Sequence, residues 1–323
     1  MSLTPSAIYQ EFQNHYLDKQ SAIQFLLTLI ENSENNSIRL QSINYLELIG
    51  FENDRSLNDK LYHFFENLLI SDVSREIRKK AAHILKKKFQ DKALYPIKWA
   101  IRYETDYECL ITIIKTLEKI ESEQSKEILT EEIMKLKKRK FIDDNQNYTN
   151  KRFKESLDKL FSRRKISDLT NQEMAQIIIN YKTIRALIHK FYTIFFQWED
   201  GVISELDLSE IGWNIWNVWR QKYSDRIIDI CEIIGLKNLS HLKILDLSNN
   251  RIKHIKDLKE LKELTNLSIS NNRIDDPKNI EYLKQMYSLR YLDISGNKVV
   301  KSIDRHEFGG IDIILYKGLP PLV

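Results

Sequence analysis

The chain has 323 residues, of which 42% are hydrophobic and 30% are charged, and its formal net charge at pH 7 is +4. This composition is ordinary for a folded protein. So small a net charge excludes a global field that would draw the whole chain to nucleic acid or to a membrane surface. Eight Gly and five Pro are few for this length, which argues against a large β-sandwich and against disordered linkers. Cys109 and Cys231 stand alone, so they indicate neither a disulfide framework nor a zinc site.

The first twenty residues are polar and lack the apolar core of a signal peptide. The apolar runs elsewhere are too short to cross a bilayer. We therefore expect a cytoplasmic protein without a membrane span. The sequence carries no pattern that sets an oligomeric state.

Three helical segments in the first third share one spacing of apolar residues. They are IRLQSINYLELI (38–49), IRKKAAHILKKK (77–88) and CLITIIKTLEKI (109–120). In this register Leu46, Leu85 and Leu117 coincide, and apolar positions three or four apart share one helix face. Each segment follows another apolar helix after a short polar turn, which predicts helical hairpins. The preceding helices are expected at residues 22–31, 61–70 and 94–102.

The middle hairpin carries the clearest signals. Ser71-Asp72 ends its first helix, and Ser74 is the candidate N-cap of the second. This hairpin resembles the HEAT family, whose unit is a helix, an Asp-containing turn and a helix with small residues, here Ala81 and Ala82. The resemblance covers about residues 18–135 and implies stacked hairpins, because one hairpin cannot bury its apolar face alone. A plain helical bundle is the alternative, since helix periodicity does not separate the two.

The segment from residue 135 to 165 has twelve Lys or Arg and four Asp or Glu. The basic residues form two clusters, which are Lys137, Lys138, Arg139 and Lys140, and then Arg163, Arg164 and Lys165. The polar run 143–147 is expected to break one helix before the next begins near Tyr148. The patch suits an acidic protein, nucleic acid or anionic lipid. The alternative, which we favour, is a pair of solvated helix faces, because clustered Lys is common on protein surfaces and the two basic clusters contain no aromatic residue for base stacking.

The strongest pattern lies in the last third. LKILDLSNNRI (242–252), LTNLSISNNRI (264–274) and LRYLDISGNKV (289–299) share the form LxxLxLxxNx followed by an aliphatic residue, and their starts lie 22 and 25 residues apart. They resemble leucine-rich repeats of the SDS22-like class, in which a short helical turn follows each strand. The resemblance covers about residues 200–323. Asn250, Asn272 and Asn297 are expected to bond backbone groups at the bend after each strand.

The repeats need covered ends. Residues 203–209 (ISELDLS) contain the LDLS core of the first repeat and predict an earlier strand without its asparagine. Trp213, Trp216 and Trp219 follow at helical spacing, and with IIDICEIIGL (227–236) they predict a capping helix or helix pair. Residues 305–323 depart from the pattern and are expected to cap the other end.

Strand side chains alternate, so the residues between the inward aliphatics face the concave side. The candidate partner-binding residues are Glu205, Asp207, Ile244, Asp246, Asn266, Ser268, Tyr291 and Asp293. A further row, Ser209, Ser248, Ser270 and Ser295, is expected on the same side. This face is acidic, and Tyr291 is its best candidate for a binding hot spot. The alternative is that LDLS is simply what this repeat class prefers.

We therefore expect an α plus α/β solenoid, in which a HEAT-like helical hairpin stack is joined to a short leucine-rich-repeat domain with a parallel β-sheet. The expected regions are 1–134 for the helical repeats, 135–198 for a basic helical connection, and 199–323 for the leucine-rich repeats with caps. No nucleotide-binding, nucleophile or zinc pattern occurs, so we expect a non-enzymatic protein-interaction scaffold with no cofactor and no metal. The resemblances imply, among other roles, regulation of a small GTPase or a phosphatase. The alternatives are a HEAT-like protein that binds nucleic acid through residues 135–165 and, last, an enzyme.

Overall fold

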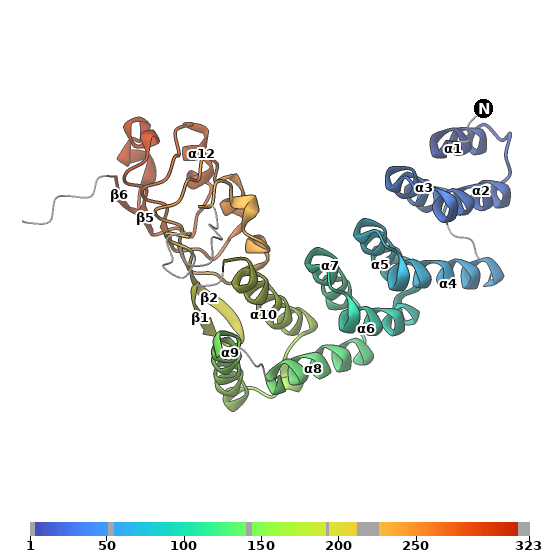
Figure 1. Ribbon diagram of the computed structural model, residues 1–323, viewed down its shortest axis with the longest axis horizontal. Helices are drawn as coiled ribbons and strands as arrows, with labels where there is room; N and C mark the ends of the chain where they lie inside the picture. Colours follow the sequence, from blue (N-terminus) through green and yellow to red (C-terminus); the bar gives the residue numbers. More distant parts are fainter. Residues whose placement is uncertain (1–3, 51–54, 140–143, 192–193, 212–225, 316–323) are drawn as a thin grey trace, which may run out of the picture. The chain divides into compact units, whose positions relative to one another are not determined.

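A computed structural model describes residues 4–50, 55–139, 144–191, 194–211 and 226–315. The chain divides into two compact units. The first comprises residues 1–131 and 170–175, and the second comprises residues 132–169 and 176–323. Figure 1 labels the helices and strands of both units. The domain boundaries expected after residues 134 and 198 stay predictions.

The first unit consists of helices that contact one another in pairs (Figure 1). Its elements are α1 (Pro5–Gln13), α2 (Lys19–Asn32), α3 (Asn36–Ile49), α4 (Arg55–Ser71), α5 (Arg75–Phe89), η1 (Gln90–Ala93), α6 (Leu94–Tyr103), α7 (Tyr107–Glu118) and the first half of α8 (Glu123–Lys138). Helix α2 pairs with α3, α4 with α5, and α6 with α7; α3, α5 and α7 then contact in series. The predicted hairpins are present, and their serial contacts are repeat-like.

A buried ion pair joins each of the first two hairpins to the turn of the next. Arg39 of α3 pairs with Asp72 through both carboxylate oxygens. Arg78 holds the same position in α5, and its Nε and Nη2 donate to Glu104 at 2.7 and 2.9 Å. The equivalent residue of α7 is Leu110, where the series of ion pairs ends. The hairpins thus repeat a polar interaction as well as an apolar spacing.

The turn between α4 and α5 differs in detail from the expectation. Ser74 is the N-cap residue of α5, but its hydroxyl makes no capping bond. Instead Asp72 accepts a hydrogen bond from the Ser74 backbone N–H, with 2.8 Å between N and Oδ1. Because the Asp72 carboxylate also holds Arg39, one side chain both shapes the turn and joins two hairpins.

The helical part of the second unit packs against a β-hairpin. It contains the end of α8, α9 (Asp144–Arg163), η2 (Ile166–Asp168) and most of α10 (Asn171–Phe191). Helix α9 begins at Asp144, earlier than the expected start near Tyr148, so residues 144–147 of the run that was expected to break the helix are helical. The Phe153 ring of α9 lies 4.7 Å from the Tyr181 ring and 4.9 Å from the Trp198 ring between centroids.

One sheet runs through the rest of the second unit, and its strand order is β1-β2-β3-β4-β5-β6. The strands are β1 (Phe195–Glu199), β2 (Val202–Asp207), β3 (Ile244–Asp246), β4 (Asn266–Ser268), β5 (Tyr291–Asp293) and β6 (Asp312–Ile314). Strands β2 to β6 pair in parallel, whereas β1 pairs with β2 in antiparallel orientation. The sheet is therefore mixed rather than purely parallel as expected.

The β1–β2 hairpin is an element that the sequence reasoning missed. Asp200 and Gly201 form its turn with φ of +52° and +83°, and two consecutive positive φ values are what a type I′ turn requires. A Cβ on Gly201 would lie 2.9 Å from Leu157 Cδ2, so the turn packs closely on α9. The Asp-Gly dipeptide between two apolar runs was the available signal.

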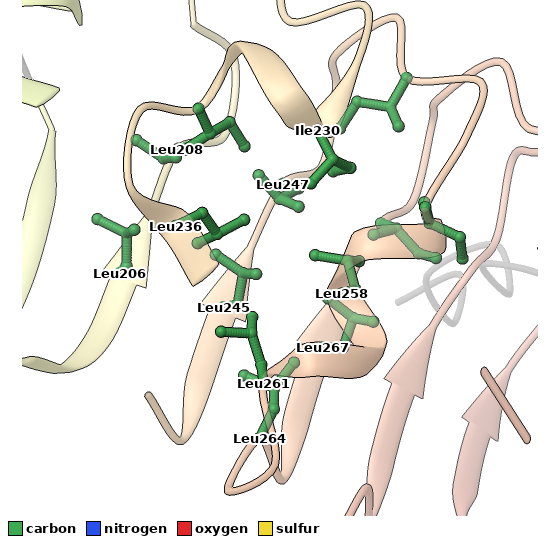
Figure 2. Packing of buried hydrophobic residues seen from close by; sticks show 14 of the residues in the cluster. Leu206, Leu208, Ile230, Leu236, Leu245, Leu247, Leu258, Leu261, Leu264 and Leu267 are labelled. Carbon is green, nitrogen blue, oxygen red and sulfur yellow. The ribbon is translucent and has the colours of Figure 1, made fainter. Parts of the chain in front are cut away.

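Short helical turns cover the other side of the sheet. They are η3 (Ile230–Glu232), η4 (Leu236–Asn238), η5 (Lys256–Glu260), α12 (Lys278–Lys284), η6 (Lys298–Ser302) and η7 (Arg305–Phe308). Figure 2 shows Leu206, Leu245 and Leu267 of successive strands packing with Leu236 and Leu258 of these turns. Strand leucines are in register across the sheet, so each repeat adds one layer to a continuous core.

The two expected caps are described only in part. Residues 226–235 contain one 3₁₀ turn, η3, and no α-helix. Trp213, Trp216 and Trp219 lie outside the described residues. At the other end Asp312–Ile314 forms the sixth strand, paired in parallel with β5, so this segment extends the sheet after η7.

The repeat asparagines bond the backbone as predicted. Asn272 donates from Nδ2 to the carbonyls of Leu247 (2.9 Å), Ile269 (3.0 Å) and Ser270 (3.2 Å). Its Oδ1 accepts from the N–H of Ile252 at 3.0 Å. Asn250 and Asn297 make the corresponding bonds. Each amide closes its own bend and joins it to the preceding repeat, which confirms its structural role.

The residue before each asparagine is in the left-handed region. Asn249, Asn271 and Gly296 have φ of +58°, +53° and +73°. Glu210 has φ of +52° at the equivalent place after β2, where Ile211 stands in the asparagine position. The degenerate first repeat therefore keeps the bend of its neighbours without the asparagine that closes it.

Candidate functional site

Two rows of side chains cross one face of the sheet, and together we name them the sheet face. The first row is Gln197, Glu205, Ile244, Asn266, Tyr291 and Asp312, and the second is Phe195, Asp207, Asp246, Ser268, Asp293 and Ile314. Residues opposite one another in register project to the same side. All eight predicted partner-binding residues lie in these rows. Strands β1 and β6 add Phe195, Gln197, Asp312 and Ile314, which the sequence reasoning missed.

The members of the sheet face differ in exposure. Phe195 is 70% exposed and Ile244 is 38% exposed, which are high values for large apolar side chains. Six of the predicted residues are half-buried, and these are Glu205, Asp207, Asp246, Asn266, Ser268 and Tyr291. Asp293 is buried. The face therefore presents its apolar side chains most openly near β1 and β3.

The predicted third row does not reach this face. Ser248, Ser270 and Ser295 are all buried, and Ser209 is half-buried. The chain bends directly after each strand, so these serines lie within the bend and not on an extended strand. For Ser248, Ser270 and Ser295 the prediction that they face a partner was wrong, because strand alternation was extended past the point where the strand ends; for Ser209 it stays a prediction.

The aspartates of the second row also have a local structural role. Oδ1 of Asp207 and of Asp246 each accepts a hydrogen bond, 2.8 Å long, from the backbone N–H two residues ahead. Asp293 accepts from the Ser295 N–H at 3.0 Å and from its hydroxyl at 2.7 Å. These bonds support the interpretation that LDLS is favoured by the bend itself. They also hold each carboxylate in one orientation.

The sheet face is negatively charged. Five of its twelve residues are carboxylates and none is Lys or Arg. Burial, and then the nearby charges of Asp293, Asp312 and Asp246, raise the pKa of the Tyr291 hydroxyl. Adjacent strands lie about 4.8 Å apart, so Asp207 and Asp246, which are partners in register, place two charges side by side.

A cavity of about 660 Å³ lies at the β1 end of the sheet face. One wall is α9, which contributes Arg152, Glu155, Ser156 and Lys159. These positions follow the i, i+3, i+4, i+7 spacing of one helix face. The sheet contributes Ile194, Phe195, Phe196, Gln197, Trp198, Glu205, Leu206, Asp207, Ile244 and Asp246. Four of the predicted residues therefore line a cavity whose other wall was not anticipated.

Helix α9 is held beside the hairpin by a buried hydrogen bond. Ser156 Oγ accepts from the Gly201 N–H at 2.8 Å. On the sheet side Gln197 Nε2 donates to Glu205 at 2.6 Å. Lys243 Nζ pairs with Glu199 at 2.6 Å. These contacts fix the wall, the turn and the floor of the cavity.

The predicted basic patch is partly neutralised. Lys137 Nζ lies 2.5 Å from Asp158 and 5.3 Å from the Phe161 ring centroid. Arg163 pairs with Asp200, and Arg164 donates to the carbonyl of Asp168 at 3.0 Å. Three further members, Lys138, Arg139 and Lys165, are exposed. Lys140 lies outside the described residues.

Comparison with known proteins identifies one family by sequence. The leucine rich repeat family model matches residues 234–274, a stretch that includes β3, β4 and the bends after them. No curated protein matches the chain. Across the described ranges, no helix is long and apolar enough to cross a membrane. Those same ranges contain no group of three or more His, Cys, Asp or Glu side chains placed to hold a metal ion.

Proposed function

We propose, starting from the leucine-rich-repeat region at residues 234–274, that the protein is a non-enzymatic scaffold that binds a protein partner on the sheet face. Leucine-rich repeats build extended concave surfaces on which proteins dock. The observation that carries the proposal is the sheet face itself, where five carboxylates and the exposed Phe195 and Ile244 lie together. Such a surface suits a partner that is basic and partly apolar.

The proposal also includes the repeat class of each region. The short helical turns after the strands support the SDS22-like class, and the serial contacts of α3, α5 and α7 support a HEAT-like stack that continues as a solenoid. A second partner would dock on that stack. Regulation of a small GTPase or a phosphatase, in the cytoplasm, is the role that these resemblances favour.

Nucleic-acid binding through residues 135–165 is the weaker alternative. The ion pairs of Lys137 with Asp158 and of Arg163 with Asp200 reduce the charge that would meet phosphates. Affinity for nucleic acid depends on the number of phosphates that basic side chains neutralise. The acidic sheet face, in the same unit, would repel a polyanion.

The test neutralises the β5–β6 part of the sheet face in the full-length chain. The variant combines Tyr291→Ala, Asp293→Asn and Asp312→Asn, where Asn at 293 keeps an Oδ1 acceptor for Ser295. The matched control is Asp257→Asn and Asp275→Asn, which removes the same two negative charges outside the strands. Affinity purification from the native host with quantitative mass spectrometry measures partner recovery.

We expect the sheet-face variant to lose at least about tenfold of a partner that wild type and control retain, which corresponds to about 1.4 kcal/mol of binding free energy. Circular dichroism checks that the two variants keep the helix content of wild type. Equal recovery by wild type, control and variant contradicts docking of a partner on this part of the sheet face.

A further inference from the structure

Resting on the proposed function, we infer that the cavity between α9 and strands β1 to β3 binds a protein segment that carries an arginine next to an apolar side chain, with an acidic side chain facing α9. We name this cavity the α9 groove. Its charged lining residues are Arg152, Glu155 and Lys159 from α9 and Glu205, Asp207 and Asp246 from the sheet, and its exposed apolar ones are Phe195 and Ile244.

The size and lining of the α9 groove select the kind of ligand. A volume of about 660 Å³ lies within the range of about 300–1,000 Å³ that is typical of ligand pockets. It accommodates the side chains of a segment and not a folded domain. Pockets for apolar small molecules are lined mostly by hydrophobic residues, whereas carboxylates and cations line much of this one. A charged protein segment therefore fits better.

The floor of the α9 groove is prepared for a guanidinium group. Asp207 and Asp246 are register partners on adjacent parallel strands, about 4.8 Å apart. A backbone N–H holds Oδ1 of each at 2.8 Å, so the carboxylates lose little freedom when a ligand binds. Arginine presents several N–H donors in a planar fork that matches carboxylates, which a lysine ammonium cannot do.

Two apolar side chains flank this acidic pair. Phe195 is the register partner of Asp207 on β1, and Ile244 precedes Asp246 by two residues on the same side of β3. They are 70% and 38% exposed. Covering an exposed apolar side chain contributes about 25 cal/mol per Å² removed from water. Apolar residues on either side of the arginine would cover them.

The wall of the α9 groove carries the opposite charge. Arg152 and Lys159 lie seven residues apart on α9, about 10 Å along the helix axis, with Glu155 between them. The wall therefore has one more positive than negative charge, while the floor contributes Glu205, Asp207 and Asp246. A segment that carries a cation on one side and an anion on the other therefore complements both the floor and the wall. A polyanion such as nucleic acid would meet the carboxylates of the floor.

The experiment uses full-length protein and a phage-displayed library of random dodecapeptides. The winning peptide is synthesised, and its Kd is measured by fluorescence anisotropy at low and physiological salt. We expect the selected sequences to share an Arg beside an aliphatic or aromatic residue. The groove variant Glu205→Gln, Asp207→Asn and Asp246→Asn should weaken binding at least about tenfold, because charge is lost while Asn keeps the Oδ1 acceptors. The control Asp257→Asn, Glu260→Gln and Asp275→Asn should bind as wild type does.

A second variant tests the wall without touching the sheet. Lys159 is exposed on α9, so Lys159→Glu leaves the core packing unchanged. This substitution should raise the Kd several-fold for a peptide whose acidic residue faces α9. Replacing that acidic residue with Lys should restore the affinity for Lys159→Glu but not for wild type.

Two results overturn the inference. One is a selection whose winners lack Arg, and the other is a winner whose affinity is unchanged in the groove variant. If the native partner is lost from the Tyr291, Asp293 and Asp312 variant but kept by the groove variant, the scaffold proposal stands and this inference falls. If neither variant loses the native partner, the proposed function fails as well.

Discussion

The helical hairpins and the strand repeats both join one repeat to the next through buried polar side chains, but with different chemistry. Between hairpins the link is a charged pair, Arg39 with Asp72 and Arg78 with Glu104. Between strand repeats it is a neutral amide, as at Asn272, which bonds backbone groups of its own and the preceding repeat. A neutral amide satisfies buried backbone groups without burying a charge. In an ion pair each charge depends on the other, so the loss of either residue leaves a charge without its counter-ion.

The two designs differ in how a repeat can vary. An asparagine bonds backbone atoms, which every residue supplies, so the neighbouring repeat needs no particular side chain. An arginine needs a carboxylate at one place in the next turn, and the series stops where Leu110 stands in α7. Each link between strand repeats therefore requires one particular residue, the asparagine. Each link between hairpins requires two, the arginine and its carboxylate partner.

Breaking one charged link should give the largest effect. Arg78→Leu leaves Glu104, whose side chain is 5% exposed, without its guanidinium. We expect the unfolding free energy of the helical unit to fall by about 3–5 kcal/mol, because a largely buried carboxylate keeps its hydrogen bond from the Asp106 N–H but loses its counter-ion. Urea unfolding followed by circular dichroism measures the loss, and hydrogen exchange locates it in α4 to α7.

The control for this variant is an exposed pair on the same unit. Lys98 and Glu131 are 36% and 53% exposed and lie 2.9 Å apart. Lys98→Ala should change stability by less than about 1 kcal/mol, because water screens the pair. Similar losses in Arg78→Leu and Lys98→Ala would show that burial does not decide the effect.

Breaking one amide link should have a slightly smaller effect. Asn272→Ala removes four hydrogen bonds to backbone groups in a buried bend. We expect a loss of about 2–4 kcal/mol, because several polar groups remain buried without partners. Asn271→Gly is the matched control, since glycine keeps the positive φ of +53° and the side chain is exposed. Backbone amides of β3 and β4 should exchange hydrogen faster in Asn272→Ala than in wild type, and Asn271→Gly should show no such increase.

The smallest effect is expected from acid, which should weaken the ion pairs of Glu47 in α3 with Lys80 and Lys87 in α5 and leave the amide links unchanged. Burial acts to raise the pKa of Glu47, but hydrogen bonds from Lys80 and Lys87 lower it to about 2, from an ordinary value of 4.5. A folded-state pKa below the unfolded one contributes stability above about pH 4.5, and this contribution is lost as the pH falls towards 2. Because Lys87 is 54% exposed, screening limits the effect to about 1 kcal/mol.

The measurement compares Glu47→Gln with wild type at pH 7 and at pH 2.5. The difference in unfolding free energy should be present at pH 7 and should nearly disappear at pH 2.5. The loss caused by Asn272→Ala should stay the same at both values, because no ionisable group takes part in its bonds. A difference for Glu47→Gln that persists in acid would contradict this assignment.

The sequence predicted the parts of the fold that follow local periodicity. The paired helices, the strands at β2 to β5 and the role of Asn250, Asn272 and Asn297 follow from side-chain spacing alone. The hairpin at β1 was missed although Asp200-Gly201 marks its turn. Strand β6 was missed because its segment, Asp312–Ile314, lacks the LxxLxLxxN pattern that marks β3 to β5.

The candidate site was predicted in part, for a physical reason. Register places Glu205, Asp207, Ile244 and Asp246 on one face, and alternation along strands is a local property. The wall of the α9 groove depends on how a helix packs against a distant hairpin, through Ser156 and Gly201. No spacing within either segment encodes that contact. The serine row failed because the bend starts before those residues.

The antiparallel turn at Asp200-Gly201 also affects how the sheet can assemble. Closing a two-residue turn joins β1 to β2 on the microsecond timescale of hairpins. Each parallel pair that follows must first close a connection of 18 to 36 residues, which is slow because the entropy of the intervening chain is lost before the pairing is gained. The hairpin gives the later strands an edge on which to add in order, so assembly would proceed from β2 outward to β6.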